Sequence, residues 1–215
     1  MAFFKCVALL AIALINLSGT EGHGRLMDPV NRGSAFRKGF NTTENWDDDG
    51  NYCGGYAIHY ELNKGKCGVC GDNYADERPR ANENGGKYGT GVIVETYKAG
   101  SEFTANVEIT ANHLGFFTFN LCPLKNSSDL ETEECFAKHK VELVRGGYKY
   151  LVETPRTGDY LIKLRLPKGL KCKHCVLRWQ YTAGNSWGYC EDGVAGALGC
   201  GDQETFRTCS DIEIQ

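Results

Sequence analysis

The chain has 215 residues, of which 24% are charged, and a formal net charge of -3 at neutral pH. A mildly acidic chain lacks the basic surface that nucleic-acid binding requires, and it offers no polybasic anchor for a membrane surface. We therefore expect neither a nucleic acid nor a membrane as partner. The length fits one domain with a sizeable hydrophobic core.

The amino-terminal segment has the pattern of a secretory signal peptide. Lys5 precedes an apolar run over 6–17, which is shorter than the roughly 20 residues that span a bilayer. Thr20 and Gly22 supply the small side chains that signal peptidase requires at the third and first positions before its cut. This predicts His23 as the first residue of a secreted, extracellular mature chain.

The predicted organisation is a signal peptide at 1–22 and a single catalytic domain at 23–215. Cleavage after Gly19 or Thr20 is the alternative boundary. No repeat, low-complexity block or linker rich in proline and serine divides the mature chain. We expect it to be a soluble monomer.

The cysteines indicate an oxidising compartment. Of the eleven, Cys6 leaves with the signal peptide, and an even remainder suits five disulfides whose pairing the sequence leaves open. The expected disulfide cysteines are Cys53, Cys67, Cys70, Cys122, Cys135, Cys172, Cys175, Cys190, Cys200 and Cys209. The pairs 67/70 and 172/175 resemble half-sites of a zinc ribbon, but their separation far exceeds the usual gap of about 15 to 20 residues. Two Asn-x-Ser/Thr triplets predict N-glycosylation at Asn41 and Asn126.

Short alternating apolar runs indicate strands. The predicted strands are 103–109, 115–121, 160–166, 176–181 and 211–214. Short strands at such spacing are typical of a β-sandwich. The stretch 29–88 is rich in Gly, Asn, Asp and aromatic residues and shows neither helical nor strand periodicity. We therefore expect a long loop region pinned by Cys53, Cys67 and Cys70.

The predicted mature terminus is itself a candidate metal ligand. A terminal histidine offers both its α-amine and its imidazole Nδ1 to one metal, and the amine, with an ordinary pKa of about 7.7 to 8.0, loses its proton readily. A second imidazole would complete a set of three nitrogens, which favours copper among the divalent first-row ions. Position favours His113, because it follows a strong strand pattern. The other histidines are His59, His139 and His174.

These three histidines have simpler interpretations. His139 and His174 lie in polar, charged stretches and are expected to be solvated loop residues, whereas His59 is expected to be structural. Among the aromatic residues, Trp179 is expected in the core. The candidates for stacking on sugar rings are Trp46, Tyr52, Tyr56 and Tyr74. The acidic run 47–49 lacks the Gly and Glu spacing of an EF-hand and is expected to be a solvated turn.

Several motifs in fixed order resemble those of the lytic polysaccharide monooxygenases, auxiliary activity family fifteen. The resemblance covers essentially all of residues 23–215. The motifs are His23-Gly24-Arg25-Leu26, Cys53-Gly54-Gly55, Cys67-Gly68-Val69-Cys70-Gly71-Asp72, Thr110-Ala111-Asn112-His113, Cys172 to Trp179, Gly184-Asn185-Ser186-Trp187-Gly188 and Glu204-Thr205-Phe206-Arg207.

The resemblance implies an all-β, immunoglobulin-like (fibronectin III-like) β-sandwich with long disulfide-stapled loops. It also implies a histidine brace, in which one copper ion is bound by the amine and imidazole of His23 and by the imidazole of His113. Phe206 falls on the axial position, where some relatives carry tyrosine. Ala111 matches the small residue on the other axial side, on the same strand face as His113 if the strand continues.

The activity implied is copper-dependent oxidative cleavage of glycosidic bonds in crystalline β-1,4-polysaccharides, with chitin placed before cellulose. An external electron donor and hydrogen peroxide or oxygen are the implied co-reactants. Glycosidases instead need two carboxylates flanking the bond, and no such pair stands out from spacing. The alternatives are a secreted module that binds chitin or cellulose without turnover and a disulfide-rich structural protein without metal.

Overall fold

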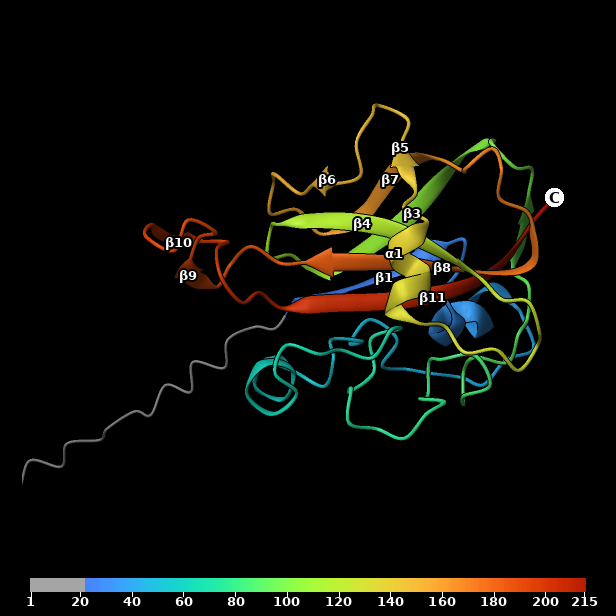
Figure 1. Ribbon diagram of the computed structural model, residues 1–215, viewed down its shortest axis with the longest axis horizontal. Helices are drawn as coiled ribbons and strands as arrows, with labels where there is room; N and C mark the ends of the chain where they lie inside the picture. Colours follow the sequence, from blue (N-terminus) through green and yellow to red (C-terminus); the bar gives the residue numbers. More distant parts are fainter. Residues whose placement is uncertain (1–21) are drawn as a thin grey trace, which may run out of the picture.

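The computed structural model describes residues 22–215, and these form two β-sheets packed face to face (Figure 1). The first sheet has the order β1-β3-β7-β5, and all its pairs are antiparallel. Its strands are β1 (His23–Asp28), β3 (Glu102–Ala111), β7 (Gly158–Arg165) and β5 (Glu142–Leu143). The second sheet has the order β2-β11-β8-β4-β6, and only β2 pairs in parallel. Its strands are β2 (Glu95–Tyr97), β11 (Thr205–Ile214), β8 (Cys172–Thr182), β4 (Phe116–Pro123) and β6 (Tyr150–Leu151).

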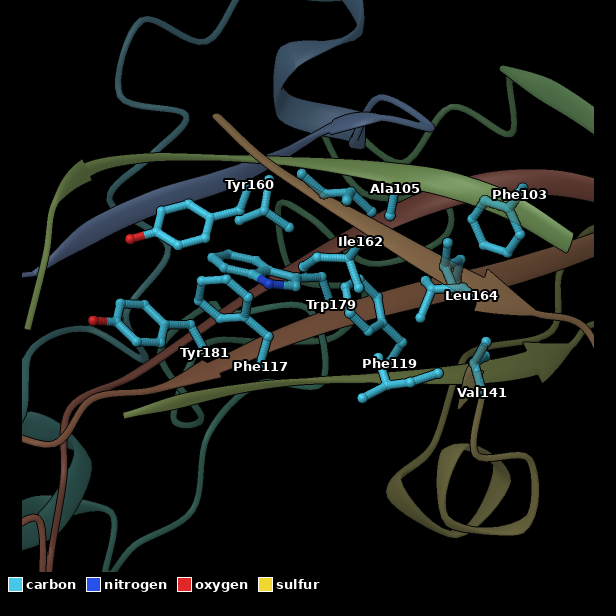
Figure 2. Close-up of a cluster of buried hydrophobic side chains, with 14 of the residues drawn as sticks. Phe103, Ala105, Phe117, Phe119, Val141, Tyr160, Ile162, Leu164, Trp179 and Tyr181 are labelled. Carbon is cyan, nitrogen blue, oxygen red and sulfur yellow. The ribbon is translucent and has the colours of Figure 1, made fainter. Parts of the chain in front are cut away.

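The core lies between the two sheets because the inward positions of each strand are apolar. In β3, buried and more exposed residues alternate, as expected for a strand with one face on the core. Figure 2 shows side chains of both sheets meeting there, with Trp179 and Phe117 at the centre. Trp179 is fully buried, as predicted. The predicted β-sandwich is therefore confirmed, and each predicted strand lies in or overlaps an observed strand.

Two strand assignments differ from the sequence-based expectation. β11 begins at Thr205 rather than near residue 211, and His23–Asp28 forms an edge strand that was not predicted. β1 alternates glycine and leucine with longer polar residues, so its apolar content is too low to stand out by periodicity. A small two-stranded hairpin, β9 (Trp187–Tyr189) and β10 (Gly196–Leu198), projects beyond the end of the sandwich (Figure 1).

The long loop region at 29–88 was predicted correctly. Within it the structure has no strand, only the 3-10 helix η1 (Arg32–Lys38) and the one-turn π-helix η2 (Ile58–Leu62). The one α-helix among the described residues, α1 (Glu133–Lys138), lies outside this region. None of the helices in residues 22–215 is long and apolar enough to cross a membrane.

All ten cysteines of the predicted mature chain pair. The disulfides are Cys53–Cys67, Cys70–Cys209, Cys122–Cys135, Cys172–Cys175 and Cys190–Cys200. The first two attach the loop region to itself and to β11. The predicted pinning by these cysteines is therefore confirmed, and the 67/70 pair does not form a local bridge.

Two predictions of solvated residues were wrong. His174 lies in β8 and places its Nε2 2.7 Å from Oδ1 of the buried Asp211. Asp48 is fully buried, where Arg25 and Arg37 bond its carboxylate. In both cases the partner is far enough along the chain that local composition gives no sign of it.

Candidate metal centre

His113 lies in the turn between β3 and β4, two residues beyond the end of β3 at Ala111. Leu114 and Gly115 both adopt left-handed backbone conformations, with φ of 57° and 89°. Gly115 is required here, because a Cβ at this position would lie 2.1 Å from the carbonyl oxygen of Thr182. Asn112 supports the turn, since its side-chain oxygen accepts the Leu114 N–H at 2.7 Å. The turn is thus held in one conformation.

The backbone of His113 is attached to the second sheet. Its N–H donates to the phenol oxygen of Tyr181 at 2.9 Å, and its carbonyl accepts the Gly184 N–H at 2.9 Å. Burial raises the pKa of the Tyr181 phenol, so this hydroxyl stays neutral. The phenol oxygens of Tyr181 and Tyr160 point out of the apolar cluster on the same side (Figure 2), and Asn112 donates to Tyr160 at 2.8 Å. The core therefore positions the turn that carries His113.

The imidazole of His113 is oriented through Nδ1. The Oε2 of Glu204 lies 2.9 Å from this nitrogen, and the amide nitrogen of Asn185 lies 2.8 Å from it. Because both contacts are to Nδ1, Nε2 is the ring nitrogen that can bind a metal. A carboxylate on the other nitrogen is the usual arrangement for a metal-binding histidine, because it fixes the ring and its tautomer.

His23 begins β1 beside the end of β3. It pairs with Ala111 in the ladder, and its ring centroid lies 6.2 Å from those of Tyr52 and Phe206. The next residue is Gly24, where a Cβ would lie 2.6 Å from Cδ1 of Ile109. Close packing on the core thus fixes the start of β1 next to the turn that holds His113.

Gly22 directly precedes His23 in the chain and packs against the imidazole of His113. An added Cβ on Gly22 would be 3.2 Å from Nδ1 of His113 and 3.1 Å from Cε2 of Phe206, and its N–H donates to Oε2 of Glu204 at 3.2 Å. Cleavage after Gly22 would convert the His23 amide nitrogen into an amine next to these groups. An amide nitrogen is a poor substitute for that donor. The predicted signal peptide otherwise lies outside the described residues.

Phe206 and Ala111 both lie close to His23. Phe206 is fully buried in β11 and stacks on Tyr181 and Tyr52, with centroids 5.6 Å and 5.9 Å apart. Ala111 is half-buried and is the last residue of β3. β3 ends at Ala111 and does not continue to His113, so the condition for the two residues to share a strand face is not met. The chain turns because Leu114 and Gly115 leave the extended conformation.

Glu204 and Asn185 were not singled out as site residues from the sequence. Glu204 lies two residues before Phe206 and immediately before β11, and in an extended chain this spacing turns two side chains to the same side. That signal was available in the motif 204–207. Asn185 lies in a loop, and no periodicity could have indicated its contact with His113.

The other predicted site residues lie away from this centre. Asn41 and Asn126 are exposed in loops, and the side chain of Asn126 contacts Asp129. His59 is buried, with Nε2 2.9 Å from the carbonyl oxygen of Gly65, as expected of a structural histidine.

The donor set fits copper rather than zinc or calcium. Residues 22–215 contain no group of three or more His, Cys, Asp or Glu side chains that could hold a metal. Two histidines suffice only when the terminal amine supplies a third nitrogen. Three nitrogens without thiolate or carboxylate ligands favour copper.

Comparison with known proteins identifies the family. A family model described as lytic polysaccharide mono-oxygenase, cellulose-degrading, matches residues 23–212. The chain is similar to the solved structure of a lytic polysaccharide monooxygenase of family AA15 from Thermobia domestica in the Cu(I) state. The two are 44% identical with a TM-score of 0.87, and the match covers 89% of this chain and 98% of the other. A comparison with curated protein sequences gave no match.

Proposed function

Since the chain belongs to the lytic polysaccharide monooxygenases, and so uses one copper ion to cleave polysaccharides oxidatively, we propose that His23 and His113 bind this ion. The ligands are the amine and imidazole of His23 and Nε2 of His113. We further propose that residues 1–22 are a signal peptide, that 23–215 is a single secreted domain and a monomer, and that Asn41 and Asn126 carry glycans. Neither nucleic acid nor membrane is a proposed partner.

The position of Gly22 carries this proposal. Gly22 is the last residue before the predicted cut, and it packs against both the His113 imidazole and the Phe206 ring. Removing residues 1–22 therefore creates the amine of His23 within reach of His113. The active protein is the processed chain, and the unprocessed chain lacks one of the three nitrogens.

The residues around the two histidines have distinct roles. Glu204 and Asn185 hold Nδ1 of His113 and so direct Nε2 toward the metal. Were copper bound there, the buried Phe206 would present an apolar ring with no oxygen ligand, and Ala111 would add only a methyl group beside His23. When bound and reduced by an external donor, copper supplies the oxidising chemistry with hydrogen peroxide or oxygen as co-substrate.

The substrate surface extends onto the β9–β10 hairpin. Its loop begins at Asn185, which contacts His113, and Cys190–Cys200 staples its base. Trp187 and Tyr189 are 60% and 64% exposed, which is unusual for aromatic side chains unless a ligand covers them. Aromatic rings stack on the apolar faces of sugars, and these two lie on the same projection as Asn185.

Of the aromatic residues predicted to contact sugar, Trp46, Tyr56 and Tyr74 are exposed, whereas Tyr52 packs beside His23 and Phe206. The proposed substrate is a crystalline β-1,4-glycan. Chitin stands first and cellulose second, on the family resemblance, and the experiment below offers both.

The test uses mature protein that starts at His23, loaded with copper and supplied with ascorbate. It is incubated with β-chitin and with cellulose, and mass spectrometry detects oxidised oligosaccharides. Oxidised products from one polymer, absent with His113→Ala, are expected and identify the substrate. Binding to either polymer without oxidised products would contradict the proposal and favour a binding module.

A further inference from the structure

One short loop segment contacts every strand that presents the proposed copper site. Residues 48–52, here called the strap, bond to β1 next to His23, to β3 near Ala111 and to β11 next to Phe206. We propose that the strap, through Asp49, positions the two copper-binding histidines relative to each other. This inference rests on the proposed copper site.

Asp49 bridges β1 and β3 where their pairing is irregular. His23 pairs with Ala111 but Gly24 pairs with Ile109, so Thr110 has no partner on β1 at this bulge. The carbonyl oxygen of Asp49 accepts the Gly24 N–H at 3.1 Å, on the outer edge of the sheet. Its Oδ2 accepts the Thr110 hydroxyl at 2.6 Å. One residue therefore bonds to both strands where each approaches its histidine.

The strap also reaches the second sheet. The carbonyl oxygen of Asn51 accepts the N–H of Arg207, the neighbour of Phe206, at 2.9 Å. The ring of Tyr52 lies beside those of His23 and Phe206, with centroids 6.2 Å and 5.9 Å away. Movement of the strap would therefore shift the groups around the metal together.

Both ends of the strap are anchored independently of the metal. The buried carboxylate of Asp48 accepts hydrogen bonds from Arg25, from Arg37 at 2.7 Å and from Ser34 at 2.7 Å. Cys53 follows the strap and is bound to Cys67 by a disulfide. A segment fixed at both ends can transmit a defined position to β1 and β3, which a mobile loop cannot do.

The contact of Asp49 with Thr110 can be removed without disturbing the fold, because it lies on the outer surface. Asp49→Ala removes the acceptor, Thr110→Val removes the donor, and Asp49→Asn keeps a side-chain oxygen that accepts the same hydroxyl. Asp47→Ala is the matched control, since Asp47 carries the same charge two residues earlier with an exposed side chain.

Copper binding of mature, metal-free protein is measured by titration calorimetry, and the Cu(II) site by electron paramagnetic resonance. Asp49→Ala and Thr110→Val are each expected to weaken Cu(II) binding about fivefold, the scale of one surface hydrogen bond, and to change the copper hyperfine splitting. The double variant should be no worse than either single variant, and Asp49→Asn should restore both readouts.

The inference and the proposed function fail in different ways. If Asp49→Ala matched Asp47→Ala in affinity and spectrum while the unsubstituted protein bound one copper, the strap would have no positioning role. If Asp49→Ala lowered only the thermal stability of the metal-free protein, its role would be structural and the inference would be overturned. If the unsubstituted protein and His113→Ala bound copper equally, the copper site itself would be wrong.

Discussion

Two pairs of a histidine with a carboxylate within residues 22–215 lie in different surroundings. His113 contacts Glu204 at 2.9 Å at the end of the sandwich that bears the β9–β10 hairpin (Figure 1), whereas His174 contacts Asp211 at 2.7 Å beneath the loop region. Within the part of the chain that the structure describes, no arginine or lysine pairs with Glu204. Asp211, in contrast, accepts hydrogen bonds from both Nε and Nη2 of Arg32.

The two carboxylates differ in how firmly they are bonded to the rest of the fold. Asp211 is fully engaged within the fold, because Arg32 also bonds to the buried Glu131 and so joins β11 to the loop region. The carboxylate of Glu204 contacts His113 and Gly22, and the second of these contacts disappears with cleavage. A histidine–carboxylate pair therefore indicates a metal centre only when the carboxylate is not also paired with a buried arginine and a further metal-binding nitrogen lies nearby.

The strongest test of this comparison replaces each of the two histidines by alanine, in two separate variants. His113→Ala should abolish specific copper binding, a larger effect than the 10- to 100-fold that loss of an outer partner costs, and leave the fold stable. His174→Ala should retain copper and lower the free energy of unfolding by about 1 to 3 kcal/mol. Calorimetric copper titration and chemical denaturation of both variants distinguish these outcomes. Loss of copper binding in His174→Ala would contradict the distinction between the two histidine–carboxylate pairs.

Asp211→Asn should weaken the fold more than any substitution at Glu204. Arg32 would lose one of the two carboxylates that pair with it in a buried position, at a cost of about 3 kcal/mol. Copper affinity should stay unchanged, since Asp211 is not near the proposed ligands. Urea denaturation measures the first effect and calorimetry the second. An unaltered unfolding midpoint would show that the buried network contributes little.

The same network predicts acid sensitivity. Burial opposes ionisation of Asp211, but the charge and hydrogen bonds of Arg32, together with His174, outweigh it and hold the pKa of Asp211 at about 2. An unfolded aspartate has a pKa of about 3.9, so this carboxylate stabilises the fold above that pH and the contribution is lost as the pH falls toward 2. The loss should be about 2 kcal/mol, measured by urea denaturation between pH 5 and pH 2.5. Asp211→Asn is the control and should lack this share of the pH dependence.

Glu204→Ala should have the smallest effect of the four. It removes the acceptor that orients His113 and should weaken Cu(II) binding about tenfold, the lower end for outer partners of a ligand. Glu204→Gln retains an acceptor oxygen and should be close to the unsubstituted protein. Equal affinity of all three proteins would mean that Asn185 and the backbone suffice to hold the ring.

The sequence predicted the sandwich and the disulfide cysteines but not the long-range polar pairs, and its assignment of the copper ligands stays a prediction. Strand periodicity located β3 and hence His113, because alternation is a local property. Asp211 and Asp48 looked unremarkable, since Arg32 is 179 residues from the first and Arg25 is 23 from the second. His174 was misassigned for the same reason. The edge strand β1 was missed because its short, glycine-containing pattern owes its order to pairing with β3 and to Asp49.

The most direct test of the copper site compares two forms of the same domain, one starting at His23 and the other retaining Gly22. Each is titrated with Cu(II) by calorimetry, and the bound metal is examined by electron paramagnetic resonance. The form that starts at His23 should bind one copper tightly with a tetragonal, nitrogen-rich spectrum, and the form that retains Gly22 should lose this site. Equal affinity and identical spectra in the two forms would contradict a site built on the amine of His23.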